Sequence, residues 1–220
     1  CGTTEADFTA EKAAGKRLPS GVVELIVVTA AKAEEKPAEE KPAEEKTGFT
    51  DVKDTDWFKA DVEAAVELGL MTGTSATTFN PKGVTTRAMV VATLYRLAGS
   101  PKVTEKAAFT DVVSGSYYEK AVAWAIENGI TTGTTTSTFS PDATCTRAQS
   151  VTFLYRALKG TASGSTNFTD VKSDAFYADA INWAVANNVT NGTSNTTFSP
   201  NADCTRAEIV TFLYRAYQGK

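Results

Sequence analysis

The stretch TCTRAQSVTFLYRAL at 144–158 returns almost unchanged as DCTRAEIVTFLYRAY at 203–217, and more loosely as VTTRAMVVATLYRLA at 84–98. In the first two, a threonine stands three residues before Gln149 or Glu208, a spacing typical of a helix-starting capping box. Met89 takes this place in the third, so half of the box is lost there. Apolar residues with helical spacing follow and predict a core-facing stripe. The stripes are Val151, Leu154, Tyr155 and Leu158, and Val210, Leu213, Tyr214 and Tyr217.

The three stretches belong to a longer internal repeat. The motif FTDV begins at positions 49, 109 and 168, and in each copy a glycine and then the arginine of the quoted stretch follow it at an unchanging spacing. Only the connection from each arginine to the next FTDV varies, by a single residue. Constant spacing with a variable joint predicts three copies of one supersecondary unit that pack on one another, at 49–108, 109–167 and 168–220.

Each copy is expected to form a helix, an irregular loop and a second helix. The first helix is clearest in SYYEKAVAWAIENG at 116–129, where Ser116 and Glu119 have capping-box spacing and Asn128-Gly129 marks the end. Gly69 and Asn188 are the matching stops. The following loop is rich in Thr, Ser and Gly, with one apolar anchor in each copy, Phe79, Phe139 or Phe198.

The segment 1–48 differs from the repeats in composition. Residues 1–30 contain one β-rich run, GVVELIVV, which predicts a single strand belonging to an upstream domain. Residues 31–48 repeat KPAEE, which predicts an extended spacer that reaches at most about 60 Å. Cys1 indicates processing of a longer chain, with a lipidated cysteine and an arbitrary starting point as the two alternatives.

Composition argues against several classes of protein. A net charge of −4 and a pI near 5.1 do not favour nucleic-acid binding, which needs a clustered basic face. The absence of histidine removes Ser-His-Asp and Cys-His catalysis, and with three cysteines it disfavours a zinc site, so we expect no cofactor or metal. No apolar run is long enough to span a membrane. Cys145 and Cys204 match Thr85 in copy one, which indicates a position for a small, partly buried side chain.

An arginine lies just inside each predicted helix start, where the helix dipole disfavours a cation. One explanation is a buried ion pair with the FTDV aspartate of the fold. The other is anion binding, in which the guanidinium and free backbone amides at the helix start together hold a carboxylate. The residues alone leave both explanations open.

From Phe49 to Lys220 the chain resembles the S-layer homology family. The resemblance is carried by FTDV, by the aromatic pair after it, by GLMTGT, GITTGT and NVTNGT, by TFNP or TFSP, and by TTRAM, CTRAQ and CTRAE. It implies a mainly α fold in which three repeats form a pseudo-threefold unit around a central helical bundle. It also implies binding of a bacterial secondary cell-wall polysaccharide, commonly ending in pyruvylated N-acetylmannosamine, in grooves between repeats.

The resemblance also carries site residues over to this chain. It implies that the arginines bind the pyruvate carboxylate, that the aspartates accept sugar hydroxyls or orient the arginines, and that the glycines let the backbone approach a sugar. These residues are Arg87, Arg147, Arg206, Asp51, Asp111, Asp170, Gly73, Gly133 and Gly192. Trp124 and Trp183 are either a stacking wall for a sugar or core residues. Copy one departs most from the pattern, since it has Met89 where the family usually has glutamate. It also has Ala64 where the other copies have Trp124 and Trp183.

The expected function is therefore non-covalent anchoring of a surface protein to the bacterial cell wall, in an extracellular location and without catalysis. The partner would be a pyruvylated secondary polymer or a peptidoglycan-linked glycan. One alternative is a calcium-dependent or protein-binding surface module, suggested by the aspartates of DVKDTD at 51–56. Another is a wall-active glycosidase using paired carboxylates.

Overall fold

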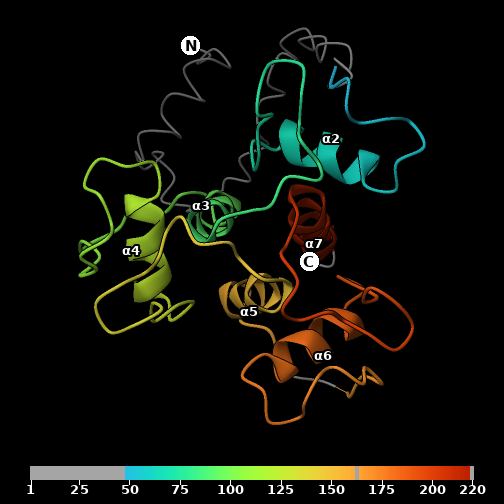
Figure 1. Ribbon diagram of the computed structural model, residues 1–220. Helices are drawn as coiled ribbons and strands as arrows, with labels where there is room; N and C mark the ends of the chain where they lie inside the picture. Colours follow the sequence, from blue (N-terminus) through green and yellow to red (C-terminus); the bar gives the residue numbers. More distant parts are fainter. Residues whose placement is uncertain (1–47, 162–163, 219–220) are drawn as a thin grey trace, which may run out of the picture. The chain divides into compact units, whose positions relative to one another are not determined.

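A computed structural model describes residues 48–161 and 164–218. The strand expected within residues 1–30, nearly all of the spacer and Cys1 lie outside these ranges. In the described ranges each repeat contributes a short outer helix and a longer inner helix, which confirms the mainly α, helix-loop-helix architecture (Figure 1). The outer helices are α2 (Lys59–Glu67), α4 (Glu119–Glu127) and α6 (Ala178–Ala186), and the inner helices are α3 (Arg87–Leu97), α5 (Arg147–Ala157) and α7 (Arg206–Gln218).

The repeats interlock through their outer helices. The main helix contacts of α4 are with α3 of repeat 1, and those of α6 are with α5 of repeat 2. The first outer helix, α2, packs on the last inner helix, α7, which closes the cycle. Each repeat therefore completes its neighbour, because the apolar face of an outer helix is covered by the inner helix of the preceding repeat.

The segments that precede the three inner helices meet at one point. Their central residues, Thr85, Cys145 and Cys204, form a closed ring of three backbone hydrogen bonds, each 2.9 Å long, and isolated antiparallel bridges flank it. Thr85 donates to Cys204, Cys204 to Cys145, and Cys145 to Thr85. Because the repeats enter this ring in the same way, the ring lies on a pseudo-threefold axis. The predicted pseudo-threefold assembly is thus confirmed.

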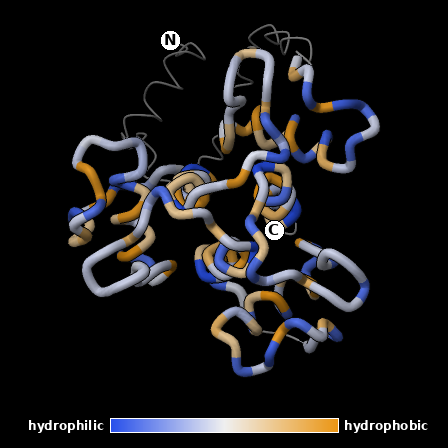
Figure 2. The backbone as a smooth tube through the Cα atoms, viewed as in Figure 1, coloured by the Kyte–Doolittle hydropathy of each residue, from blue (hydrophilic) through white to orange (hydrophobic). Residues whose placement is uncertain are grey.

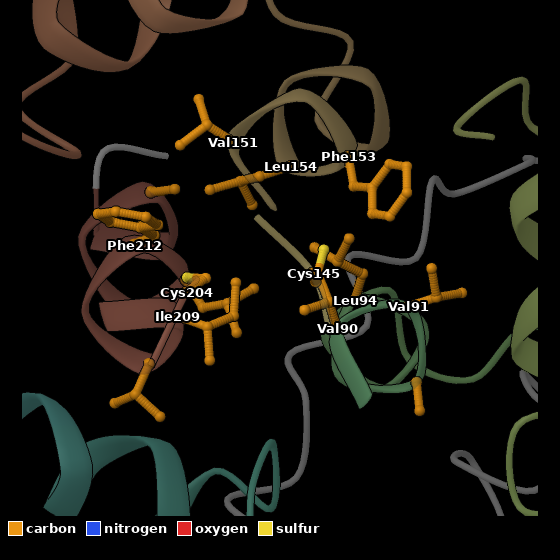
Figure 3. Packing of buried hydrophobic residues seen from close by; sticks show 14 of the residues in the cluster. Val90, Val91, Leu94, Cys145, Val151, Phe153, Leu154, Cys204, Ile209 and Phe212 are labelled. Carbon is orange, nitrogen blue, oxygen red and sulfur yellow. The ribbon is translucent and has the colours of Figure 1, made fainter. Parts of the chain in front are cut away.

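Next to this ring the inner helices share one hydrophobic core. Its buried side chains include Leu94, Leu154 and Ile209, one from each inner helix, and both cysteines lie among them (Figure 3). The outer loops consist largely of residues of intermediate hydropathy, with some hydrophilic stretches (Figure 2). Tyr217, which the sequence placed on the apolar stripe of α7, is 45% exposed, so that assignment is wrong. The packed stripe ends at Ala216, the last buried residue of α7.

Both tryptophans at the disputed position belong to the core. Trp124 and Trp183 are buried, and their rings lie 5.7 and 5.6 Å from those of Tyr95 and Tyr155 on the preceding repeat's inner helix. Such aromatic pairs add to the stability that burial provides. The structure therefore favours packing over sugar stacking for these two side chains.

The inner helices begin as the capping-box spacing predicts. Thr146 Oγ1 accepts from the Gln149 amide and Gln149 Oε1 accepts from the Thr146 amide, and Thr205 and Glu208 make the same exchange. In repeat 1 the methionine has no acceptor, so only the bond to the threonine side chain forms.

The outer helix of repeat 2 begins later than predicted. It starts at Glu119, its N-cap is Tyr118, and Ser116 Oγ has no hydrogen-bond partner among the described residues. The capping box expected from Ser116 and Glu119 is therefore wrong, because the Glu119 carboxylate accepts from the Gly115 amide in the preceding turn. The predicted ends are correct: Gly69, Gly129 and Asn188 follow the outer helices with φ between +57° and +67°.

Candidate functional site

Each FTDV aspartate fixes the loop of its own repeat. Asp111 accepts hydrogen bonds from the amides of Phe139 (2.9 Å) and Ser140 (2.7 Å), using both carboxylate oxygens. Asp51 and Asp170 bind the corresponding amide pairs at 2.7 to 2.9 Å. These are charge-assisted bonds to backbone, so the aspartates shape the loop whatever else they contact.

The loop glycines are needed for the same turn. A Cβ on Gly133 would lie 2.6 Å from the carbonyl oxygens of Thr135 and Thr138 and 2.7 Å from the Phe109 ring. Gly133 also has a φ of +91°, which side-chain-bearing residues rarely adopt. Gly73 and Gly192 are equally crowded by their own loops. The close approach that each glycine permits is therefore an approach to its own repeat.

The arginine of each inner helix reaches into the loop of the next repeat. Its Nε donates to the carbonyl of the anchor phenylalanine, with pairs Arg87–Phe139 (2.9 Å), Arg147–Phe198 (3.0 Å) and Arg206–Phe79 (2.8 Å). The guanidinium carbon also lies 4.6 to 4.8 Å from the centre of the same phenylalanine ring, within cation–π range. We name the three places where an arginine meets the next repeat junction 1–2, junction 2–3 and junction 3–1.

The structure corrects both sequence-based explanations of the arginines in part. No ion pair joins a motif arginine to an FTDV aspartate within 48–161 and 164–218, since the two hold the carbonyl and the amide of the same phenylalanine. The helix-start amides are not free either. In junction 2–3 those of Arg147 and Ala148 donate to loop carbonyls of repeat 3 at 2.9 and 3.1 Å. The donors left for a ligand are therefore on the guanidinium.

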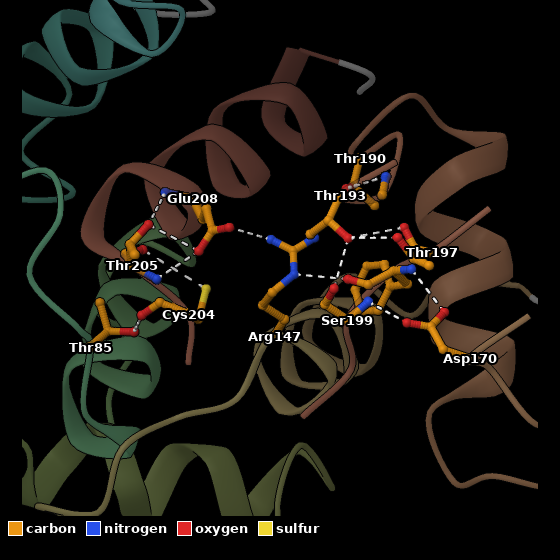
Figure 4. A network of polar contacts seen from close by, with 12 residues as sticks. Thr85, Arg147, Asp170, Thr190, Thr193, Thr197, Ser199, Cys204, Thr205 and Glu208 are labelled. Carbon is orange, nitrogen blue, oxygen red and sulfur yellow. Dashed lines mark hydrogen bonds and ion pairs between the residues drawn. The ribbon is translucent and has the colours of Figure 1, made fainter. Parts of the chain in front are cut away.

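The three guanidinium groups have different partners beyond the shared phenylalanine. Arg147 Nη1 donates to Glu208 Oε1 at 2.5 Å (Figure 4). Arg206 Nη2 donates to the Thr72 carbonyl at 2.6 Å. Arg87 Nη2 is buried and has no partner among the described residues. Burial lowers the pKa of Arg87 and of Arg206, although each remains charged at neutral pH.

Three exposed aromatic residues were missed by the sequence analysis as candidates. Trp57, Tyr117 and Phe176 occupy the same position in the three repeats and are each at least 60% exposed, whereas the aromatic residue after each is buried or partly buried. Tyr117 of repeat 2 lies beside Thr86 of repeat 1, at junction 1–2. The signal was present in the aromatic pairs, but only the fold shows which member of each pair faces outward.

Comparison with known protein families agrees with this geometry. A model described as the S-layer homology domain matches residues 48–88, 108–149 and 167–210, more than half of the chain, and each range holds one aspartate, one glycine and one arginine of the site. The chain belongs to the S-layer homology domain family. The three junctions are therefore contacts between consecutive S-layer homology repeats, in cyclic order.

Relatives that carry such repeats include surface proteins and large enzymes. The chain is 39% identical over 106 residues to the surface-layer 125 kDa protein of Lysinibacillus sphaericus. The matched segment covers 48% of this chain and 9% of that protein. The chain is 30% identical over 76% of its length to an amylopullulanase of Thermoanaerobacterium thermosulfurigenes and over 73% to an endoglucanase of Bacillus sp. strain KSM-635. It spans 9% and 18% of those two proteins. The family and the surface-protein relatives indicate a location at the cell surface or in the cell wall, and they support a role in wall anchoring.

The cysteines of repeats 2 and 3 are free thiols, and both are fully buried, whereas the match with Thr85 suggested a partly buried position. Burial raises the pKa of Cys145 to about 11 and that of Cys204 to about 12, so both stay protonated at neutral pH.

In the described part of the chain, no helix has the length and hydrophobicity needed to cross a membrane. Nor do three or more potential metal-ligating side chains come together there.

Proposed function

We propose that the three S-layer homology repeats anchor a surface protein non-covalently to the bacterial cell wall by binding a secondary cell-wall polysaccharide that carries pyruvylated N-acetylmannosamine. The observation that carries this proposal is the repeated junction, where a buried arginine faces the loop of the next repeat. Membership of the family and similarity to surface-layer proteins support it.

The chemistry of each junction suits a sugar that bears a carboxylate. A ketal pyruvate presents two acceptor oxygens, and a guanidinium can donate to both. We propose that Arg87, Arg147 and Arg206 mark the three candidate positions for that carboxylate. Asp51, Asp111, Asp170, Gly73, Gly133 and Gly192 would hold the loops in the shape that meets the sugar. The exposed aromatic residue of each repeat offers an apolar ring face for stacking.

Co-sedimentation with purified sacculi tests the proposal. The full chain should pellet with sacculi that carry the pyruvylated polymer and stay in solution after hydrofluoric acid has stripped that polymer. Binding should persist in the presence of a calcium chelator. Equal binding to stripped peptidoglycan would contradict the polymer assignment, and loss of binding with chelator would favour the calcium-dependent surface module instead.

We also propose that these repeats bind glycan without cleaving it. Two of the relatives are named as polysaccharide-degrading enzymes, but the chain matches 9% and 18% of their lengths. Incubation of the chain with labelled wall fragments should release no reducing ends. Release of reducing ends would point to the glycosidase alternative.

A further inference from the structure

The three junctions differ at the third residue of the inner helix that belongs to the repeat after each arginine. In junction 2–3 this residue is Glu208, which contacts Arg147. By the equivalence of the repeats, Gln149 takes this position opposite Arg87, and Met89 takes it opposite Arg206. A carboxylate, an amide and a thioether thus occupy equivalent places beside three equivalent cations.

Glu208 can cap its own helix and also pair with Arg147, because its carboxylate has two acceptor oxygens. Its Oε2 accepts from the Thr205 amide at 2.8 Å, which completes the capping box. Its Oε1 accepts from Arg147 Nη1 (Figure 4). In junction 2–3 the protein itself therefore places a carboxylate on the guanidinium.

Gln149 cannot do both. Its single acceptor oxygen is engaged by the Thr146 amide at 3.3 Å, and its nitrogen can only donate. No hydrogen bond joins Gln149 to Arg87 in the described ranges. Nη2 of Arg87, a different terminal nitrogen from the one that Glu208 contacts at Arg147, is also buried there without a partner, and the residue is only 4% exposed. A buried, charged donor without an acceptor is unfavourable, so an acceptor brought by a ligand is worth more there than at a satisfied arginine.

Junction 3–1 is intermediate. Met89 offers no acceptor to Arg206, but Arg206 Nη2 donates to the Thr72 carbonyl at 2.6 Å. A backbone oxygen thus satisfies the group that is unpaired in Arg87. Junction 1–2 is the one place in the described ranges where a motif arginine has an unmet, buried donor.

We propose that junction 1–2 is the carboxylate-binding site of this chain, and that junction 2–3 is closed to external carboxylates because Glu208 already occupies its arginine. One carboxylate oxygen of the ligand takes at Nη1 of Arg87 the place that Oε1 of Glu208 takes at Arg147, and the other accepts from the unpaired Nη2. The residue at the third helical position thereby selects which junction binds an anion. This inference rests on the proposed binding of a pyruvylated glycan and adds the position at which its carboxylate is held.

Calorimetric titration of the full chain with the pyruvate ketal of methyl N-acetylmannosaminide tests the inference. We expect one site per chain, and at least tenfold weaker binding of the neutral methyl ester of the ketal. Gln149→Glu should weaken binding at least tenfold, because the new carboxylate can bond both the Thr146 amide and Arg87. Glu208→Gln, the matched reverse exchange, should raise the stoichiometry to two. Both variants keep a capping acceptor, and thermal unfolding checks that each is folded.

Several results would overturn the inference. Unchanged binding in Gln149→Glu would do so, as would loss of binding in a folded Arg147→Gln variant while Arg87→Gln binds normally. If the wild-type chain does not bind the ketal but pellets normally on sacculi, the proposed carboxylate site is contradicted and the anchoring proposal is not. If the chain does not pellet on sacculi but gives the expected titration pattern, the anchoring proposal is contradicted and the proposed carboxylate site is supported.

Discussion

At the residue scale, the anchor phenylalanine of each loop is where two repeats meet. An aspartate of its own repeat binds its amide, and an arginine of the preceding repeat binds its carbonyl, as with Asp111 and Arg87 at Phe139. The arginine therefore has a structural role through Nε, and only its terminal nitrogens differ from one junction to the next. In the proposed function, the structural and binding roles of the arginine thus fall on different atoms of one side chain.

Removal of one aspartate charge should loosen its loop. We expect Asp111→Asn to lower the free energy of unfolding by about 3 kcal/mol, since it replaces two hydrogen bonds to a charged acceptor and puts an amide donor against a backbone N–H. Urea denaturation followed by circular dichroism measures this. Asp142→Asn, on the exposed surface of the same repeat, should change stability by less than about 0.5 kcal/mol. Equal stabilities of the two variants would contradict the proposed role of Asp111 in the loop.

The residue that we propose selects between junctions should also affect stability. Glu208→Gln should lower the free energy of unfolding by about 1–3 kcal/mol, because Arg147 loses its carboxylate partner. Gln149→Glu should raise it by about 1 kcal/mol, because Arg87 gains an acceptor. Urea denaturation of both variants without ligand provides the comparison. A stability loss in Gln149→Glu would indicate that the new carboxylate does not reach Arg87.

The buried thiols make stability depend on alkaline pH. Their pKa values are raised from 9.0 to about 11 and about 12 in the fold, so above pH 9 the unfolded chain releases protons that the folded chain keeps. Stability is unaffected by the thiols below pH 9 and falls as pH rises above it, by about 1 kcal/mol per thiol at pH 10. A Cys145→Thr/Cys204→Thr variant, with the residue type of Thr85, should lose less stability between pH 8 and pH 10 in urea titrations. Parallel losses in the two proteins would contradict the effect.

Sequence could identify the site residues but not their partners. Arg87, Asp111 and Gly133 are visible through their constant spacing. Their main partners are backbone amides and carbonyls. Nearly every residue has these groups, so the amino-acid type at a position does not show which of them a side chain will contact. The sequence therefore suggested Arg–Asp pairs and free helix amides, whereas the fold puts the main chain of the next repeat in both places.

At the element scale, the inner helices were predictable because their start signals are local. A capping box involves residues three apart, so Thr146 with Gln149 and Thr205 with Glu208 form in the structure as expected. Ser116 and Glu119 have the same spacing, yet the helix begins at Glu119 because the glutamate bonds to Gly115 in the preceding turn. Spacing predicts a capping box reliably only where no other donor competes for the glutamate.

The incomplete cap of α3 provides a test that separates two contributions. Met89→Gln should restore the reciprocal bond to the Thr86 amide and raise the free energy of unfolding by about 0.5–1 kcal/mol. Met89→Glu should raise it further, because a carboxylate can also pair with Arg206 across junction 3–1. Thermal unfolding of the two variants beside the wild type measures the order. If glutamine and glutamate stabilise equally, the third helical position of repeat 1 does not reach Arg206.

At the scale of the whole repeat assembly, from position 48 to position 218, the cycle of contacts has no free end. Each outer helix packs on the preceding inner helix, and α2 on α7 joins the first repeat to the last. Repeats in an open array would unfold from their ends, but a closed cycle transmits a local loss to every member. The regular return of FTDV predicted three packed copies, whereas the closure follows from contacts between residues as far apart as Asp61 and Thr211.

That pair tests closure directly. Asp61 on α2 accepts a hydrogen bond of 2.6 Å from Thr211 on α7, in a buried setting, while repeats 2 and 3 have Ala121 and Ala180 where repeat 1 has Asp61. Thr211→Ala leaves a buried carboxyl group without its partner and should lower the free energy of unfolding by about 2–4 kcal/mol. Asp61→Ala should cost less, since the threonine can turn to a backbone carbonyl as Thr152 does.

The double variant Asp61→Ala/Thr211→Ala should recover most of the loss seen in Thr211→Ala, which a double-mutant cycle in urea would show as a coupling energy of at least about 1 kcal/mol. Hydrogen exchange then distinguishes a closed cycle from three independent repeats. In Thr211→Ala the slowest amides of α5, which belong to repeat 2, should exchange faster by the same free energy as those of α7. If protection falls in repeats 1 and 3 alone, the repeats unfold separately and the contact between α2 and α7 does not make them one cooperative unit.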